Sequence, residues 1–119
     1  QSDLDNAFQQ AQARLPDAEF LRVSSMVALD DFQDRELDFV YIDGDHSFLH
    51  ITQDLCHWAR KVKKGGIVAG HDYFISDWAK SVVHVVPVVD AYCKAYKIEL
   101  NVTGERGVRE QSPSWWFVK

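Results

Sequence analysis

Apolar residues recur along the chain in two patterns, one with helical spacing and one of short continuous runs. Helical spacing over residues 3–14 and from Ser47 to about Val62 predicts two helices, and Pro87 fits the first turn of a third, which runs to about Tyr96. Short, mostly apolar segments predict five strands, of which Leu37–Ile42 has the near-continuous apolar run of a buried parallel strand. These strands are Phe20–Val23, Leu37–Ile42, Ile67–Ala69, Ile98–Val102 and Trp115–Val118.

The order of these elements predicts the fold class. Strands alternate with helices, which is typical of an α/β protein with a largely parallel sheet and helices on both faces. The last two strands, joined by a turn at Gly104–Gly107, are expected to form an antiparallel end to a mixed sheet. Residues 26–32 are expected to form a short helix or loop, and residues 72–86 to be irregular. A length of 119 residues fits one domain.

The charge balance narrows the class of partner. The net charge is −5, whereas binding to nucleic-acid phosphates uses clustered lysines and arginines. The one basic run, Arg60–Lys64, lies at the end of a predicted helix, where cations complement the helix dipole. No apolar run reaches the roughly 18 residues of a membrane span, and no signal peptide precedes the first helix. We therefore expect neither nucleic acid nor a membrane as partner.

The two cysteines point to a reducing compartment. Cys56 and Cys93 lack the spacing of a zinc site or a disulfide framework and lie in helical patterns. We expect both to be buried free thiols, and the protein to be cytoplasmic. The chain opens with Gln1 rather than an initiator methionine, so we expect a trimmed or partial chain.

Acids and histidines follow the two central strands. They are Asp43, Asp45 and His46 after the first, and His71 and Asp72 after the second. Neighbouring strands lie about 5 Å apart, and open parallel sheets bind ligands at this carboxyl edge. Carboxylates with imidazole suit Mg²⁺ or Mn²⁺, although histidine is a poor ligand for Mg²⁺. The alternative is that Asp43 and Asp72 cap helices or brace loops.

Two further segments bear on nucleotide binding. Ser24 and Ser25 follow the strand Phe20–Val23, where their hydroxyls either contact the adenine or ribose of a ligand or cap the next segment. Lys64-Gly65-Gly66 feeds a strand rather than a helix, so it is not a phosphate-binding loop. The glycine-rich nucleotide loop that normally precedes such strands is not in this chain.

Three segments resemble the class I S-adenosylmethionine-dependent methyltransferases. They are Asp38–Ser47, the pair Asp54 and Trp58, and Lys64–Tyr73. The similarity is to the subgroup with an IDGDHSY…GG…GHDY signature, and it covers roughly residues 18–119. Phe48 stands where that subgroup usually has tyrosine.

This resemblance implies a fold, a reaction and a set of roles. The fold would be a Rossmann-like methyltransferase sheet, and the reaction O-methyl transfer from S-adenosylmethionine to a small-molecule hydroxyl, with Mg²⁺ or Mn²⁺ as possible assistance. The implied metal ligands are Asp43, His71 and Asp72. The implied general base is Asp45 or His46. The implied cofactor-binding residues are Ser24, Ser25 and Asp43.

The chain departs from the family in its first half. The family's first strand, its G-x-G-x-G loop and the acid that ends its second strand have no counterpart here. The family's sheet order is 3-2-1-4-5-7-6, so a truncated sheet would leave a gap beside the strand Leu37–Ile42. We expect either that Phe20–Val23 moves next to that strand, giving order 3-4-5-7-6, or that two copies pair their exposed edges as a homodimer.

Two other functions stay open at this point. A non-catalytic binding or assembly module is favoured by the missing glycine loop, whereas the acid and histidine clusters favour an enzyme. A metal-dependent hydrolase would use the same acids without S-adenosylmethionine.

Overall fold

A computed structural model describes residues 2–75, 83–104 and 112–119 of the chain. The helices are α1 (Asp3–Arg14), α2 (Ser25–Ala28), the 3₁₀ turn η1 (Leu29–Asp31), α3 (Phe48–Lys61) and α4 (Val85–Tyr96). The strands are β1 (Leu37–Ile42), β2 (Val62–Gly70), β3 (Asn101–Val102) and β4 (Trp115–Val118). Of the turn expected at residues 104–107 and the irregular segment expected at 72–86, residues 105–107 and 76–82 lie outside the described residues.

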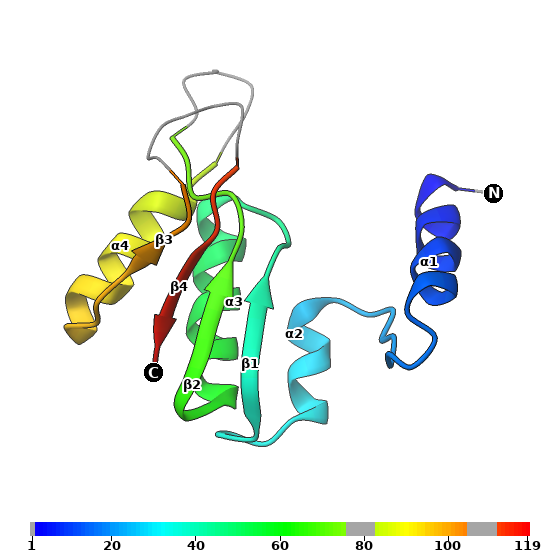
Figure 1. Ribbon diagram of the computed structural model, residues 1–119, viewed down its shortest axis with the longest axis horizontal. Helices are drawn as coiled ribbons and strands as arrows, with labels where there is room; N and C mark the ends of the chain where they lie inside the picture. Colours follow the sequence, from blue (N-terminus) through cyan, green and yellow to red (C-terminus); the bar gives the residue numbers. More distant parts are fainter. Residues whose placement is uncertain (1, 76–82, 105–111) are drawn as a thin grey trace.

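The four strands form one mixed sheet in the order β1-β2-β4-β3 (Figure 1). β1 and β2 are parallel, in a register that pairs Phe39 with Ile67 and Ile42 with Gly70. β4 pairs antiparallel with both β2 and β3. The expected mixed sheet is confirmed, and so are the last four positions of the order 3-4-5-7-6.

The core lies between this sheet and helices α3 and α4. Val68 of β2 and Trp115 and Phe117 of β4 are fully buried in it. On α3 the stripe begins at Ile51 and Leu55, which repeat at helical spacing and face the sheet. Burial of such side chains contributes about 1.5–3 kcal/mol each, so this face holds the domain together.

Our expectation of helices on both faces of the sheet is wrong for the described residues. Both α3 and α4 pack on the same face, which leaves the other face open (Figure 1). On that open face the side chains of Phe39, Tyr41 and Val118 are each about half exposed. A right-handed β1-α3-β2 crossover accounts for the position of α3.

The expected strand Phe20–Val23 does not form. Its residues fold back on α1 instead: the ring of Phe20 packs edge-on against Phe8, and Arg22 pairs with Asp5. The outer edge of β1 therefore has no strand beside it in the described part of the chain, and α2 lies along that side (Figure 1). A short, mostly apolar segment forms a strand only when another strand is available to pair with its backbone groups.

Pairing of two copies through such open edges stays a prediction. Among the described residues no strand pairs with the outward-facing backbone of β1, and an isologous contact between two copies would pair both edges equally. We expect light scattering at micromolar concentration to give the mass of a dimer. A monomer under those conditions would contradict it.

The cysteine expectation is half right. Cys93 on α4 is buried, and burial raises the pKa of its thiol to about 11. Cys56 on α3 is exposed, so burial was wrongly expected for that residue. Neither forms a disulfide.

Among the described residues, no helix combines the length and the apolar character needed to cross a bilayer.

Candidate functional site

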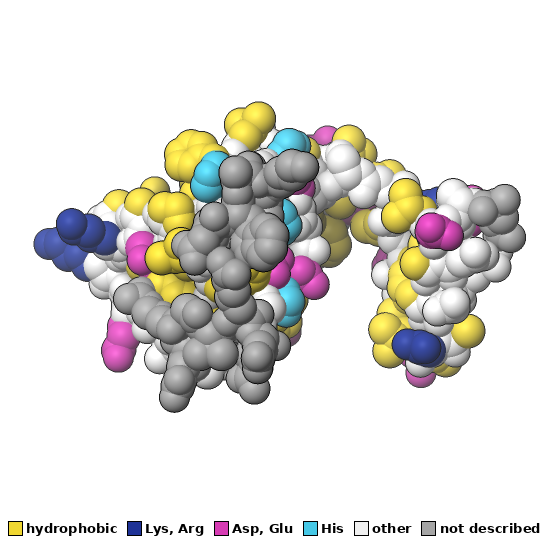
Figure 2. Space-filling view, turned by 90° about the horizontal axis from the view of Figure 1, so that it is seen from above, with side chains coloured by type: hydrophobic (Ala, Val, Ile, Leu, Met, Phe, Trp, Pro, Cys, Tyr) yellow, Lys and Arg dark blue, Asp and Glu magenta, His cyan; other side chains and the backbone are white. Residues whose placement is uncertain are grey.

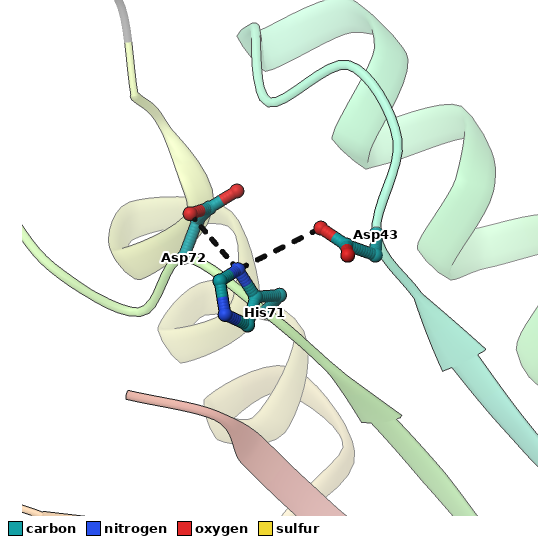
Figure 3. Close-up of side chains that lie close together, drawn as sticks. All are labelled: Asp43, His71 and Asp72. Atoms are coloured by element: carbon teal, nitrogen blue, oxygen red, sulfur yellow. Dashed lines mark hydrogen bonds and ion pairs between the residues drawn. The ribbon is translucent and has the colours of Figure 1, made fainter. Parts of the chain in front are cut away.

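Three of the predicted site residues converge where β1 and β2 end. The parallel register sets Asp43 beside His71 and Asp72, and the backbone N–H of His71 donates to the carbonyl oxygen of Ile42 at 3.0 Å. The imidazole Nδ1 of His71 lies 3.1 Å from Oδ1 of Asp72 and 3.6 Å from Oδ1 of Asp43 (Figure 3). Seen from above, histidine and acidic side chains gather at this end of the main body, with α1 held apart (Figure 2).

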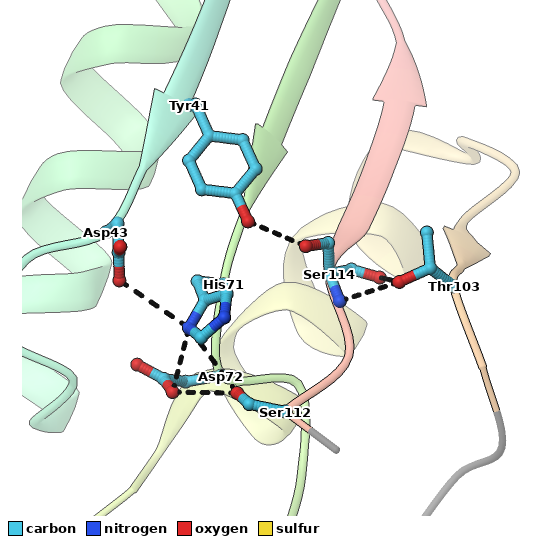
Figure 4. Close-up of polar contacts among 7 residues, drawn as sticks. All are labelled: Tyr41, Asp43, His71, Asp72, Thr103, Ser112 and Ser114. Carbon is cyan, nitrogen blue, oxygen red and sulfur yellow. Dashed lines mark hydrogen bonds and ion pairs between the residues drawn. The ribbon is translucent and has the colours of Figure 1, made fainter. Parts of the chain in front are cut away.

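The backbone turns sharply to aim Asp72 at this cluster. Asp72 has a φ of 62°, in the left-handed region that aspartate tolerates better than most residues. The hydroxyl of Ser112 then donates to Oδ1 of Asp72 at 2.9 Å and lies 3.4 Å from Nδ1 of His71 (Figure 4). Ser112, in the segment that leads into β4, thus helps to orient both the Asp72 and the His71 side chains.

A second polar contact lies beside the first. The hydroxyls of Tyr41 and Ser114 are 2.6 Å apart, and Ser114 is in turn held by Thr103, whose Oγ1 accepts from its backbone N–H at 2.9 Å (Figure 4). Sequence reasoning missed Ser112 and Ser114, because they follow the cluster by about 40 residues. Only the closing hairpin brings them to it.

The cluster fits a six-coordinate divalent cation. One donor atom from each of Asp43, His71 and Asp72 lies within 4.8 Å of the others. Ligands at about 2.1 Å from an octahedral ion lie about 3.0 Å apart when adjacent and about 4.2 Å apart when opposite. The distances from His71 to the two carboxylates match adjacent positions after a small adjustment. One imidazole with two carboxylates favours Mn²⁺ over Mg²⁺.

Asp45 and His46 lie next to the cluster but are held differently. The backbone N–H of Ser47 donates to Asp45 at 2.8 Å, and this contact is the main reason that the pKa of Asp45 is lowered. His46 borders a small hollow that the three cluster residues also line. The backbone N–H of His84 donates to the carbonyl of His46 at 2.9 Å, which ties this loop to the start of α4.

Ser47, His50 and Asp45 do not form a nucleophilic triad. Nδ1 of His50 lies 2.8 Å from the hydroxyl of Ser47 and 3.4 Å from Oδ2 of Asp45. A triad needs the acid on one ring nitrogen and the nucleophile on the other. Here both partners meet the same nitrogen, so the histidine cannot relay a proton between them.

A pocket of about 540 Å³ opens on the α2 side of the same edge. It is lined by Ser25, Val40, Tyr41, Ile42, Asp43, Gly44, Asp45, His50, Asp54 and Trp58. Asp43 belongs both to this pocket and to the cluster of acids and histidine. The cluster of Asp43, His71 and Asp72 and the pocket therefore lie side by side at this edge and share Asp43.

The two predicted serines have different positions. The hydroxyl of Ser24 accepts from the backbone N–H of Val27 at 3.3 Å, which makes Ser24 the N-cap of α2. Ser25 lines the pocket and donates to Asp54 at 2.6 Å. Asp54 was quoted for family resemblance but not predicted as a site residue. The available signal was a charged residue within the buried stripe, between Ile51 and Leu55.

The parallel unit β1-α3-β2, with acids at its carboxyl edge, defines a Rossmann-like α/β protein, a class that usually binds ligands at that edge. The chain belongs to a methyltransferase domain family, which matches residues 2–73. This is the class I family of S-adenosylmethionine-dependent enzymes, as the sequence resemblance indicated. Among curated proteins, none matches the chain.

A solved structure agrees with this fold. An O-methyltransferase family protein from Burkholderia thailandensis is similar, with a TM-score of 0.65 and 12% sequence identity. The match covers 98% of this chain and 40% of that chain, so the chain spans less than half of the length of this neighbour. At this identity the likeness establishes the fold.

Proposed function

We propose that the protein takes part in methyl transfer from S-adenosylmethionine to a hydroxyl group of a small molecule, assisted by a divalent cation. The observation that carries the proposal is the cluster of Asp43, His71 and Asp72 beside a pocket of about 540 Å³. A hydroxyl held at the cluster would face a methyl donor held in the pocket. Alignment of two reactants in this way removes much of the entropic barrier to transfer.

The proposed cation site gives each residue a role. A divalent cation held there would supply Lewis-acid chemistry that favours loss of the proton from a substrate hydroxyl. Asp43, His71 and Asp72 hold the ion, and Ser112 keeps the Asp72 carboxylate turned toward it. Mn²⁺ is the first choice because of the imidazole, and Mg²⁺ the second.

The proton of the hydroxyl needs an acceptor. His46 and Asp45 both lie next to the cluster, and we assign the base to His46 first. The lowered pKa of Asp45 makes its carboxylate a weaker base, because the N–H of Ser47 already stabilises its charge. Asp45 is the alternative base.

The proposed cofactor pocket is acidic, which suits a cationic cofactor. Its charged side chains are the carboxylates of Asp43, Asp45 and Asp54, and none of its lining residues in the described part of the chain is a lysine or arginine. S-adenosylmethionine carries a net positive charge, which the field of such an acidic pocket attracts as the molecule approaches. In the family the missing glycine loop binds the methionine part, so we propose that this pocket holds the adenine side.

Calorimetric titration with S-adenosylmethionine tests the proposal. We expect heat of binding to the unaltered chain, and further heat from Mn²⁺ added afterwards. Asp43→Asn should weaken both events, because Asp43 borders both places. Asp38→Asn, an equal change of charge at the far end of β1, should weaken neither. Absence of heat with S-adenosylmethionine up to millimolar concentration would contradict the proposal.

The two rival functions have their own signatures. Ester hydrolysis that requires Mn²⁺ but not S-adenosylmethionine would indicate the metal-dependent hydrolase. The open face of the sheet, with Phe39 and Tyr41 half exposed, favours a binding or assembly module. Stable association without binding of the cofactor or the cation would indicate that module.

A further inference from the structure

We propose that Asp54 is a specificity-determining residue of this pocket, which accepts a hydrogen bond from the amino group of a purine ring. The inference rests on the proposed function, since it takes the pocket to hold the adenine side of the cofactor. It adds a residue and a selectivity that the metal cluster and the rim acids do not explain.

Asp54 is unusual in being a carboxylate inside the buried stripe of α3. Only 7% of the residue is exposed, and burial of a carboxylate is costly unless donors compensate it. Oδ1 accepts from the hydroxyl of Ser25 at 2.6 Å, and within the described part of the chain this is its one hydrogen bond. A neutral hydroxyl compensates only part of the cost, so the group retains the capacity to accept from a ligand.

The second carboxylate oxygen faces the wall of the pocket. Oδ2 lies 3.3 Å from the position that a Cβ on Gly44 would occupy, so it points toward the loop after β1. Gly44 and Asp54 both line the pocket. Because glycine has no side chain, this oxygen stays within reach of a bound molecule.

The surroundings indicate what kind of donor reaches Asp54. Val40, Ile42 and Trp58 give this part of the pocket an apolar, partly aromatic lining that suits a flat ring. The acids Asp43 and Asp45 are both more than half exposed, which suits flexible, hydrated groups at the rim. A ring with an amino group on its edge therefore matches the buried acceptor. An anionic group would be repelled by all three carboxylates.

The alternative is that Asp54 only ties α2 to α3 through Ser25. Such a tether would change the affinity for every ligand of the pocket by a similar factor. If Asp54 instead accepts a hydrogen bond from the ligand, a ligand without a donor binds more weakly, because the buried carboxylate is then left without that bond. Discrimination between two ligands therefore separates the two roles.

The experiment compares adenosine with purine riboside, which lacks the amino group, by titration followed through the indole N–H signal of Trp58. We expect the unaltered chain to bind adenosine at least about tenfold more tightly. In Asp54→Asn the two dissociation constants should come within about threefold of each other, because the amide keeps an acceptor for Ser25 but loses the anionic one. Asp38→Asn, which removes the same charge from an exposed position, should keep the full discrimination.

A second variant makes the tether testable. Ser25→Ala releases α2 but leaves the Asp54 carboxylate, so the preference for adenosine should persist even if both affinities fall. Equal binding of the two nucleosides by the unaltered chain, or an unchanged ratio in Asp54→Asn, would overturn the role of Asp54 and leave the proposed function standing. Failure of both nucleosides to bind up to millimolar concentration would contradict the pocket assignment itself, and the role of Asp54 with it.

Discussion

Replacement of Gly70 by alanine is expected to destabilise the domain strongly. A Cβ at this position would lie 2.7 Å from Nε1 of Trp115 and closer still to two carbons of the same ring. Trp115 is fully buried between the sheet and the helices, so its ring cannot move aside. Overpacking against a rigid ring costs about 3 kcal/mol, out of roughly 6–18 kcal/mol expected for a domain of this length.

Thermal unfolding followed by circular dichroism measures this effect. We expect the midpoint of Gly70→Ala to fall by roughly 10–15 °C. Gly65→Ala is the matched control, because nothing lies within 4 Å of its Cβ position and only its φ of 85° is strained. That strain costs about 1–2 kcal/mol. Equal unfolding midpoints for Gly70→Ala and Gly65→Ala would contradict a clash with Trp115.

A double variant identifies the cause. Trp115→Phe shortens the ring that a Cβ on Gly70 would meet, and it removes an indole N–H that has no hydrogen-bond partner among the described residues. The Gly70→Ala change should therefore cost less free energy of unfolding in the Trp115→Phe background. A coupling of about 1 kcal/mol or more is expected for side chains in direct contact. Strict additivity would show that the damage arises elsewhere.

The strands that the sequence located well are those that pair with a neighbour in the sheet. β1 and β4 have the predicted bounds, and each is a mostly apolar segment hydrogen-bonded to β2. The segment Phe20–Val23 is also mostly apolar, but its Arg22 pairs with Asp5 of α1, and no strand lies beside it in the described part of the chain. Apolar composition alone therefore does not make a strand, because a pairing partner in the sheet is also needed.

Element boundaries differ from the predicted ones for reasons outside the local pattern. β2 begins at Val62, five positions before the predicted Ile67, because Val62 pairs with Leu37 and the backbone of Gly66 bonds to Lys119. α4 begins at Val85, two residues before Pro87. Proline is tolerated there because the N–H groups of a first helical turn have no partner within the helix.

Part of the candidate site could be predicted from the sequence, and part depends on long-range packing. The nearness of Asp43 to His71 and Asp72 was predictable, since parallel neighbouring strands end at the same edge. The support from Ser112 was not, because it depends on where the chain returns after α4. The pocket beside Asp54 was not predictable either, since it depends on how α2 packs against α3.

Removal of a cluster carboxylate is the second change expected to have a large effect. Asp72→Asn should weaken Mn²⁺ binding by more than about tenfold, because it replaces an anionic ligand that is already oriented by Ser112. Electron paramagnetic resonance of free Mn²⁺ measures the dissociation constant directly. Asp45→Asn removes the same charge from the same edge without removing one of the three ligands, so it should cost less than about threefold. An equal loss of Mn²⁺ affinity in the two variants would mean that the acids at this edge attract cations only through their overall negative charge.

The ratio of Mn²⁺ to Mg²⁺ affinity tests the role of the His71 imidazole more directly than either affinity alone. Mg²⁺ prefers oxygen ligands, whereas Mn²⁺ accepts nitrogen readily, so His71 should create a preference for Mn²⁺. His71→Ala should therefore narrow the ratio of Mn²⁺ to Mg²⁺ affinity, while Ser112→Ala should weaken both ions together, by up to about tenfold, and leave the ratio unchanged. An unchanged ratio in His71→Ala would mean that only the two carboxylates hold the ion. The histidine would then be free to act as the base in place of His46, at a distance of 3.6 Å from Asp43.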